Sequence, residues 1–160
     1  MTESEQKPTI NFYIANGPYG VFSNFDTKHP FTIDGVLWPT SEHYFQAKKF
    51  EDTPYEEIIR TASSASVAAK LGRSRELPLR SDWEFVRNDV MWKALYEKFS
   101  QNMDAALILL GTGNAVLVEH TVNDSYWGDG GDGSGKNMLG IQLMELRGEL
   151  NRERFDHDWE

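Results

Sequence analysis

The sequence predicts an α+β domain in which several helices surround a small β-sheet. Three observations lead to this prediction: apolar residues at helical spacing over long segments, a few short β-rich runs, and no internal repeat. The 160 residues are enough for one domain with a buried core, and 39% hydrophobic residues fit an ordinary globular composition. We expect this domain to cover residues 9–152, between a disordered tail at 1–8 and a C-terminal tail at 153–160.

The first half of the chain begins with β-structure and continues with helices. The runs "TINFYI" and "GVFSNF" are typical of strands, and "FTIDGVLWP" predicts a hairpin that turns at Asp34-Gly35. A helix is expected to begin at Pro39–Glu42, where hydroxyl residues can cap it, and to run to about Phe50. Two short helices follow, in "PYEEIIRTA" and in "SASVAAKLG", the second ending at Gly72.

A long amphipathic helix is the clearest feature of the second half. It covers residues 81–102, where Ser81 and Glu84 have the spacing of a capping box. Its apolar stripe consists of Phe85, Val86, Val90, Ala94, Leu95 and Phe99. We further expect a helix at 103–111, a strand at 115–122, a glycine-rich loop at 123–137 and a last helix at 138–151.

Composition excludes several classes of function. The net charge of −9 argues against general nucleic-acid binding, because an acidic chain is repelled by phosphate backbones. The chain has no cysteine, no basic start followed by an apolar stretch, and no apolar run of membrane-spanning length. We therefore expect a cytoplasmic protein that has no disulfide and does not bind membranes. Its four histidines lack metal-ligand spacing, so no metal or cofactor is predicted, and His43 and His120 are expected to be packed or hydrogen-bonded.

One basic cluster interrupts the acidic chain. The stretch "KLGRSRELPLR" contains four basic residues, among them Arg73, Arg75 and Arg80, and a single acid, Glu76. Such a cluster can hold a small phosphate, and it can equally be a solvated face that pairs with acidic neighbours.

The glycine-rich stretch "GDGGDGSGKN" has five glycines in ten residues, which is more backbone freedom than a turn requires. It matches the first part of a phosphate-binding loop, but Asn137 replaces the serine or threonine that would hold magnesium. A calcium loop is also excluded, because Gly140 stands where a glutamate is needed. Either its amides bind an anion or it is a flexible connector; Trp127 and Asp129, an aromatic ring beside a carboxylate, favour a ligand site.

The stretch "SEHYFQAKKF" places unlike chemical groups on one helix face. Glu42, Phe45, Gln46 and Lys49 are spaced by three or four residues and share a stripe, whereas Lys48 lies to the side. A salt-bridged surface row is one interpretation of this stripe. The neighbouring aromatic residues favour another, in which burial lowers the pKa of Lys49 and makes its amine a nucleophile. Glu42 opposes that shift, and the sequence does not decide the balance.

Taken together, "FSNF", "WPTSEHYFQAKKF", "GRSRELPLR" and "VEHTVNDSYWGDGGDGSGKNMLG" resemble the NADAR superfamily, and within it the single-domain bacterial YbiA-like N-glycosidases. The resemblance covers about residues 9–150. It implies hydrolysis of the bond between ribose C1 and nitrogen in phosphorylated ribosylamino-pyrimidine intermediates of riboflavin synthesis. Some members of the superfamily also release ADP-ribose from modified guanine.

The resemblance also implies roles for particular residues. The catalytic group would comprise Lys49, Glu42 and Asp129. For substrate binding the resemblance implies Asn24 and Trp127, to which the glycine-rich loop adds Gly128 and Gly130 and the basic cluster adds Arg73 and Arg75. The expected partner is a phosphorylated nucleoside-like small molecule or ADP-ribosylated guanine, with no metal and no cofactor.

Two mechanisms and two other classes of protein remain open. Lys49 can capture C1 and form an imine, which we favour, or a carboxylate can stabilise an oxocarbenium-like centre. A non-catalytic sensor of ADP-ribose or nucleotides would need the phosphate and base contacts but no buried amine. A purely structural protein would explain neither the helix stripe nor the glycine-rich loop.

Overall fold

The computed structural model describes residues 6–157, which form two compact units. The inserted unit is Asn24–Asn102, and the split unit combines the segment up to Ser23 with the segment from Met103 onward. Both units contain helices and strands, which confirms the α+β class, although two separate strand pairs replace the single small sheet that we expected. Residues 1–5 and 158–160, the outer parts of the two expected tails, lie outside the described residues.

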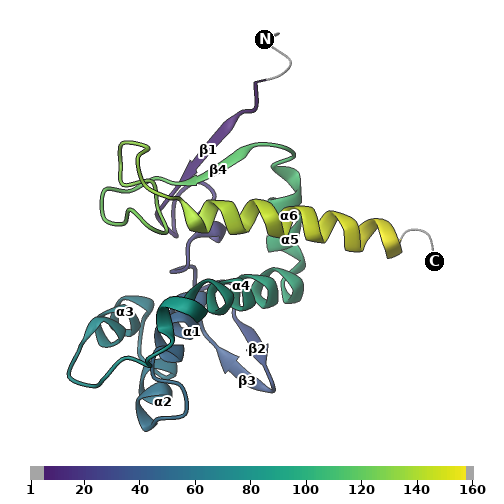
Figure 1. Ribbon diagram of the computed structural model, residues 1–160. Helices are drawn as coiled ribbons and strands as arrows, with labels where there is room; N and C mark the ends of the chain where they lie inside the picture. The colour runs from purple at the N-terminus through teal and green to yellow at the C-terminus, as the bar shows by residue number, and fades with distance from the viewer. Residues whose placement is uncertain (1–5, 158–160) are drawn as a thin grey trace. The chain divides into compact units, whose positions relative to one another are not determined.

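In the split unit, two parallel strands pack against a long helix (Figure 1). Strand β1 (Thr9–Phe12) pairs with β4 (Val116–Glu119), so that Asn11 lies opposite Val118. The side chains of Phe12 and Leu117 are buried on one face of this pair. Helices α5 (Met103–Gly111) and α6 (Met138–His157) complete the unit, and α6 contacts both β4 and α5.

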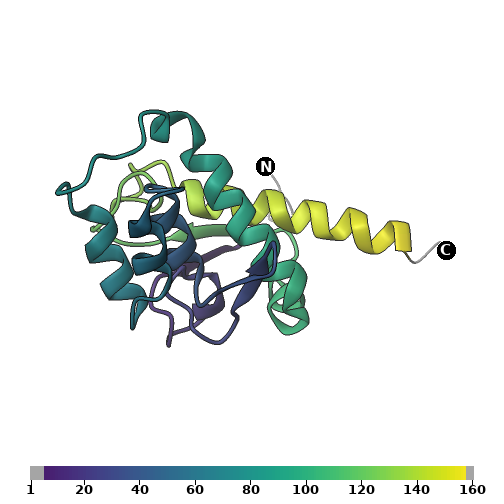
Figure 2. The ribbon, with the colours of Figure 1, turned by 90° about the horizontal axis from the view of Figure 1, so that it is seen from below.

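In the inserted unit, one short helix is surrounded by the other elements. Figures 1 and 2 show this helix, α1 (Ser41–Lys48), beside α3 (Ala65–Arg73), and it also packs against α2 (Pro54–Arg60) and α4 (Trp83–Gln101). A hairpin of β2 (Phe31–Ile33) and β3 (Val36–Trp38) lies on the same core. The centre of the inserted unit is aromatic and includes Phe31, Trp38, Tyr44 and Phe50.

Two local signals in the sequence are confirmed. Thr40 caps α1, because its side-chain oxygen accepts a hydrogen bond from the backbone N–H of His43 at 3.1 Å. The hairpin turns at Asp34 and Gly35, whose φ angles of 52° and 78° are the positive pair that a tight type I′ turn requires.

Four expectations at the level of single elements are corrected. The stretch expected as a second strand contains a 3-10 turn at Gly20–Phe22. Asp82 takes the N-cap position of α4 without a side-chain cap, so the Ser81–Glu84 capping box does not form. Phe85 is 87% exposed, so it is not part of the buried apolar stripe of α4. Helix α6 runs six residues past Asn151, to His157, and so enters the segment expected as a tail.

A buried ionic cluster connects α4 to the segment before the hairpin. Lys98 Nζ lies 3.3 Å from Asp26 Oδ2, and His29 Nδ1 lies 2.6 Å from the same oxygen. Burial alone would raise the pKa of Asp26, but the charge of Lys98 and the hydrogen bonds to this carboxylate outweigh it and lower the pKa. This cluster anchors the start of the inserted unit, where Asn24 lies.

Among the helices that the structure describes, none is long and apolar enough to cross a lipid bilayer.

Candidate active-site residues in the two units

The N-terminus of α1 is fixed by Asn24. The backbone carbonyl of Asn24 accepts the N–H of Glu42 at 3.1 Å, and its Oδ1 accepts the hydroxyl of Ser41 at 2.7 Å. Within the helix, Gln46 Nε2 donates to Glu42 Oε1 at 2.7 Å, across one helical turn. Glu42 is only 7% exposed, so its carboxylate is held in a largely dry environment.

A glycine on α3 allows this arrangement. A Cβ atom built on Gly72 would lie 2.0 Å from Gln46 Oε1 and 2.7 Å from its Cβ. Any side chain at this position would therefore push Gln46 away, and with it the amide that holds Glu42.

Lys49 directly follows α1 and keeps helical backbone angles, with φ −59° and ψ −25°. Its Nζ lies 5.5 Å from the ring centre of Phe45 and 5.9 Å from that of Trp83, and the residue is 7% exposed. Burial, together with the charge of Arg75, lowers the pKa of Lys49 from 10.5 to about 8. The charge of Glu42 opposes this shift and that of Arg73 adds to it. The lowering effects outweigh Glu42, so the amine of Lys49 is partly neutral, a point that the sequence did not decide.

Lys48 occupies a different environment from its neighbour. Its Nζ lies 5.5 Å from the ring of Trp38 and 5.4 Å from that of Tyr44, and it donates to Glu56 at 3.0 Å. Burial by itself would lower the pKa of Lys48, but the hydrogen bond and charge of Glu56 raise it. Lys48 is thus a charged residue paired with Glu56, and the two lysines occupy different environments, as the helical spacing predicts.

Arg80 is set apart from the other arginines of the predicted basic cluster by its ion pairs. This guanidinium is occupied by two carboxylates, with Nε 2.6 Å from Asp82 Oδ1 and Nη1 2.6 Å from Glu51 Oε2. The backbone N–H of Arg80 also donates to the carbonyl of Lys49 at 3.1 Å, and its Nη1 to that of Lys48 at 3.4 Å. Arg80 therefore closes the C-terminal end of α1 and is not free for a phosphate.

Arg73 and Arg75 remain exposed at the end of α3. One nitrogen of Arg75 donates to the carbonyls of Gly72 and Ser74, which holds its guanidinium against the chain. Arg73 makes no side-chain hydrogen bond to the residues that the structure describes. Since both arginines lower the pKa of Lys49 through their charge, they lie within electrostatic reach of its amine.

In the split unit, Asp129 is the centre of the glycine-rich loop. Its Oδ1 accepts the N–H groups of Thr121 at 3.0 Å and Gly131 at 2.8 Å, and its Oδ2 lies 2.7 Å from His120 Nδ1. The hydrogen bond from His120, followed by those from the two amides, lowers the pKa of Asp129. The carboxylate is therefore ionised and fixed in position.

The loop is an ordered structure whose amides are largely used within it. The N–H of Gly130 donates to the carbonyl of Asp124, and that of Asn137 donates to the carbonyl of Gly128. Helix α6 begins with the N–H groups of Met138 and Leu139 bonded to carbonyls of the loop. These amides are occupied within the chain, which argues against their use as an anion cradle.

The glycines of the loop act through their shape. A Cβ on Gly128 would meet the carbonyl oxygen of Asp124 at 2.8 Å, and Gly130 has a φ of +74°. Trp127 is half-buried, and its ring meets that of Tyr126 edge-on at 5.0 Å. The tight backbone thus places an aromatic ring and a carboxylate two residues apart in fixed positions.

The histidines named from the sequence are hydrogen-bonded, as predicted. His43 Nε2 donates to the carbonyl of Ala62 at 3.0 Å, and Nδ1 lies 2.7 Å from Thr40 Oγ1. Burial lowers the pKa of His43, which keeps its ring neutral. Within residues 6–157, no group of three or more histidine, aspartate and glutamate side chains is arranged to hold a metal ion.

A desolvated amine with a fixed carboxylate on the same helix is typical of an enzyme that attacks an electrophilic carbon. Comparison with known proteins identifies the family of this chain. Residues 11–151 match the NADAR domain, and the chain belongs to that family. It is 56% identical over 149 residues to N-glycosidase YbiA of Shigella flexneri serotype 5b, covering 93% of this chain and 92% of that protein.

Other relatives extend this picture. An N-glycosidase of Nostoc punctiforme is 41% identical, covering 89% of this chain and 92% of its own. A riboflavin biosynthesis protein of Vibrio vulnificus is 43% identical over 88% of this chain and 38% of its own length. The NMR structure of Escherichia coli YbiA superposes with a TM-score of 0.88 at 55% identity, covering 95% of this chain and 90% of that one.

Trp83 was not predicted to lie near Lys49, and Arg80 was predicted only as a member of the basic cluster. Trp83 supplies a ring beside the amine, and Arg80 fixes the carbonyl that follows it. Both come from positions more than 30 residues away, so spacing within the helix could not reveal them. The buried Lys98 did have a signal, because it falls between Leu95 and Phe99 on the buried side of its helix.

Proposed function

We propose that this chain hydrolyses the bond between ribose C1 and nitrogen in a phosphorylated ribosylamino-pyrimidine of riboflavin biosynthesis. The chain is an N-glycosidase, a hydrolase of N-glycosidic bonds, as its relatives of similar length are named. The non-catalytic sensor considered from the sequence is therefore set aside. The riboflavin names of longer relatives support the substrate class.

The observation that carries the mechanism is the pKa of Lys49, which lies at about 8. An amine with this pKa is about one-tenth neutral at pH 7, whereas an ordinary lysine is almost wholly charged. The neutral amine attacks C1, the C1–nitrogen bonding pair leaves with the base, and the adduct opens to an imine that water hydrolyses. Glu42, held by Gln46, transfers the protons between these steps.

The remaining site residues are assigned to binding. Arg73 and Arg75 hold the phosphate of the substrate, because guanidinium groups suit paired contacts to its oxygens. Asn24 contacts the ribose through its side-chain amide. Trp127 stacks on the base and Asp129 acts on the ribose side.

Borohydride separates the covalent route from the dissociative one. In the covalent route, reduction during turnover traps a sugar on the peptide that contains Lys49, and mass spectrometry detects it. Continued turnover with no adduct would contradict the imine, and would favour a route in which Glu42 or Asp129 stabilises an oxocarbenium-like centre.

The substrate is tested with two purified compounds offered in parallel. One is a ribosylamino-pyrimidine phosphate and the other is ADP-ribosylated guanosine; free base and free sugar are measured for each. We expect faster release from the pyrimidine. Preferential release of ADP-ribose from guanosine would overturn the riboflavin assignment while leaving the N-glycosidase class unchanged.

A further inference from the structure

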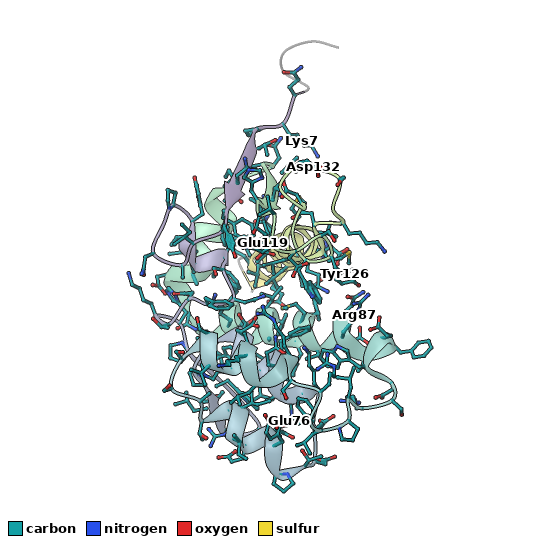
Figure 3. All side chains as sticks on the ribbon, turned by 90° about the vertical axis from the view of Figure 1, so that its left-hand side faces the viewer. Lys7, Glu76, Arg87, Glu119, Tyr126 and Asp132 are labelled. Carbon is teal, nitrogen blue, oxygen red and sulfur yellow. The ribbon has the colours of Figure 1, made fainter. Side chains whose placement is uncertain are left out.

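Two aromatic rings, those of Phe45 and Trp83, flank the amine of Lys49. The Nζ atom lies 5.5 Å from the ring centre of Phe45 and 5.9 Å from that of Trp83, and the two ring centres are 5.0 Å apart. Phe45 precedes Lys49 by about one helical turn, whereas Trp83 is the first residue of α4, where Figure 3 labels Arg87 one turn further along. Both rings are nearly buried and belong, like Lys49, to the inserted unit.

The neighbouring Lys48 shows what a carboxylate adds to such a pair of rings. Its Nζ lies at similar distances from two ring centres, 5.5 Å from Trp38 and 5.4 Å from Tyr44, but it also donates to Glu56 at 3.0 Å. That hydrogen bond and charge raise the pKa of Lys48 and keep its amine protonated. The described part of the chain provides no ion pair of this kind for Lys49, whose amine has the rings alone in direct contact.

A ring face and a carboxylate act differently on a lysine before it reacts. The face of an aromatic ring is negative and attracts a cation, but it offers no charged partner for an ammonium group and excludes water from it. Burial therefore lowers the pKa of Lys49 to about 8 while a group that attracts positive charge stays beside the amine. A nucleophile that is neutral before attack and cationic afterwards requires both properties.

We propose that the rings of Phe45 and Trp83 are further catalytic groups, whose faces stabilise the positive charge that forms on Lys49 Nζ during the reaction at ribose C1. The Nζ lone pair forms the bond to C1, the C1–nitrogen bonding pair leaves with the base, and Glu42 passes a proton from Nζ to that base. The ring oxygen of the ribose then leaves C1 with its own bonding pair and a proton from Glu42, while Nζ and C1 form a cationic iminium. Water adds to C1, its proton returns to Glu42, and release of the sugar restores the amine. This inference rests on the proposed function and adds to it two residues that contact the reacting nitrogen.

Fluorinated tryptophans introduced at position 83 alone test the ring face, because fluorine withdraws electron density from the face with little change of shape. Above pH 8 the free amine is neutral, so only the cation formed later loses the attraction of the ring. There, kcat/KM for base release should fall with each added fluorine, by about threefold to thirtyfold over the series. Below pH 8 the starting ammonium loses the same attraction, so the two effects offset and kcat/KM should change by less than about twofold.

Two further series complete the design. Fluorinated phenylalanines at position 45 should give the same loss above pH 8, and they keep the test valid if the variants at position 83 fold poorly. Fluorinated tryptophans at position 38 are the matched control, because the ring of Trp38 faces Lys48, and kcat/KM should stay unchanged at both pH values. Constant kcat/KM at positions 83 and 45, or losses of equal size above and below pH 8, would overturn the proposal, since rings that only fill space do not distinguish the charge of the amine.

Trapping with borohydride separates this inference from the proposed function. A wild type that releases no base, or that turns over without an adduct on Lys49, refutes the imine route and this inference with it. A wild type that forms the adduct, beside fluorinated variants that lose nothing above pH 8, rejects this inference alone.

Discussion

Replacing Lys49 by methionine should abolish activity and stabilise the protein. The two side chains have similar length, and a thioether also packs well between the rings of Phe45 and Trp83. A lysine whose pKa falls from 10.5 to about 8 is destabilised as a cation by about 3 kcal/mol at neutral pH. Removing this buried charge should therefore raise the free energy of unfolding by about 2 to 3 kcal/mol, since some cation–ring attraction is lost.

The pH dependence of this gain follows from the direction of the shift. The folded pKa of about 8 lies below the unfolded value of 10.5, so the unfolded state binds more protons between these two pH values. The free energy of unfolding of the wild type therefore rises relative to that of Lys49→Met from pH 8 to 10.5. The advantage of the variant is full below pH 8 and is lost above pH 10.5.

Urea unfolding at pH 7 and pH 10 measures both quantities, with base release measured on the same samples. Lys48→Met is the matched control, because Lys48 is paired with Glu56 and its pKa is raised. The control should keep its activity and lose stability. A destabilised Lys49→Met, or a difference that does not change with pH, would show that Lys49 is not a desolvated amine.

Four further outcomes are expected. Below pH 8, kcat/KM should rise about tenfold per pH unit, following the neutral fraction of Lys49, and a flat profile would contradict the amine nucleophile. Gly72→Ala should lower Tm and kcat through its collision with Gln46, whereas Gly111→Ala, with open space around its Cβ, should leave Tm unchanged or raise it. Arg73→Ala should weaken binding of the phosphorylated substrate about tenfold to a hundredfold, measured against the dephosphorylated form, and equal weakening of both would make it structural. Activity should persist in excess chelator, and loss that one divalent ion restores would contradict the absence of a metal step.

Local signals predicted the fold where the cause of the structure is itself local. The turn at Asp34-Gly35 and the cap at Thr40 involve residues within a few positions of each other, and both were predicted correctly. The 3-10 turn at Gly20 was not, because it depends on close packing: a Cβ there would lie 1.9 Å from the carbonyl oxygen of Ala15. The exposure of Phe85 likewise depends on where the packing of α4 begins, which periodicity does not reveal.

The same distinction between local and distant causes applies to the candidate site. Helical spacing separated Lys49 from Lys48, since Lys49 directly follows α1 and keeps its helical backbone angles. The pKa of Lys49 could not be predicted, because Trp83 and Arg75 approach it from other helices and segments. The hydrogen bond between Asp129 and His120 was not predicted either, since the two residues lie nine positions apart in the sequence.

The interrupted order of the split unit bears on how the chain folds during synthesis. Strand β1 leaves the ribosome first, but its partner β4 follows only after the whole inserted unit has been made. At about 5 to 20 residues per second, β1 waits several seconds with its edges unpaired. The inserted unit has all its elements available before then and can fold first. A nascent chain stalled after Asn102 has left the ribosome but before Val116 has done so should therefore protect Asn24–Asn102 from protease, while leaving β1 open to cleavage and to pairing with other chains.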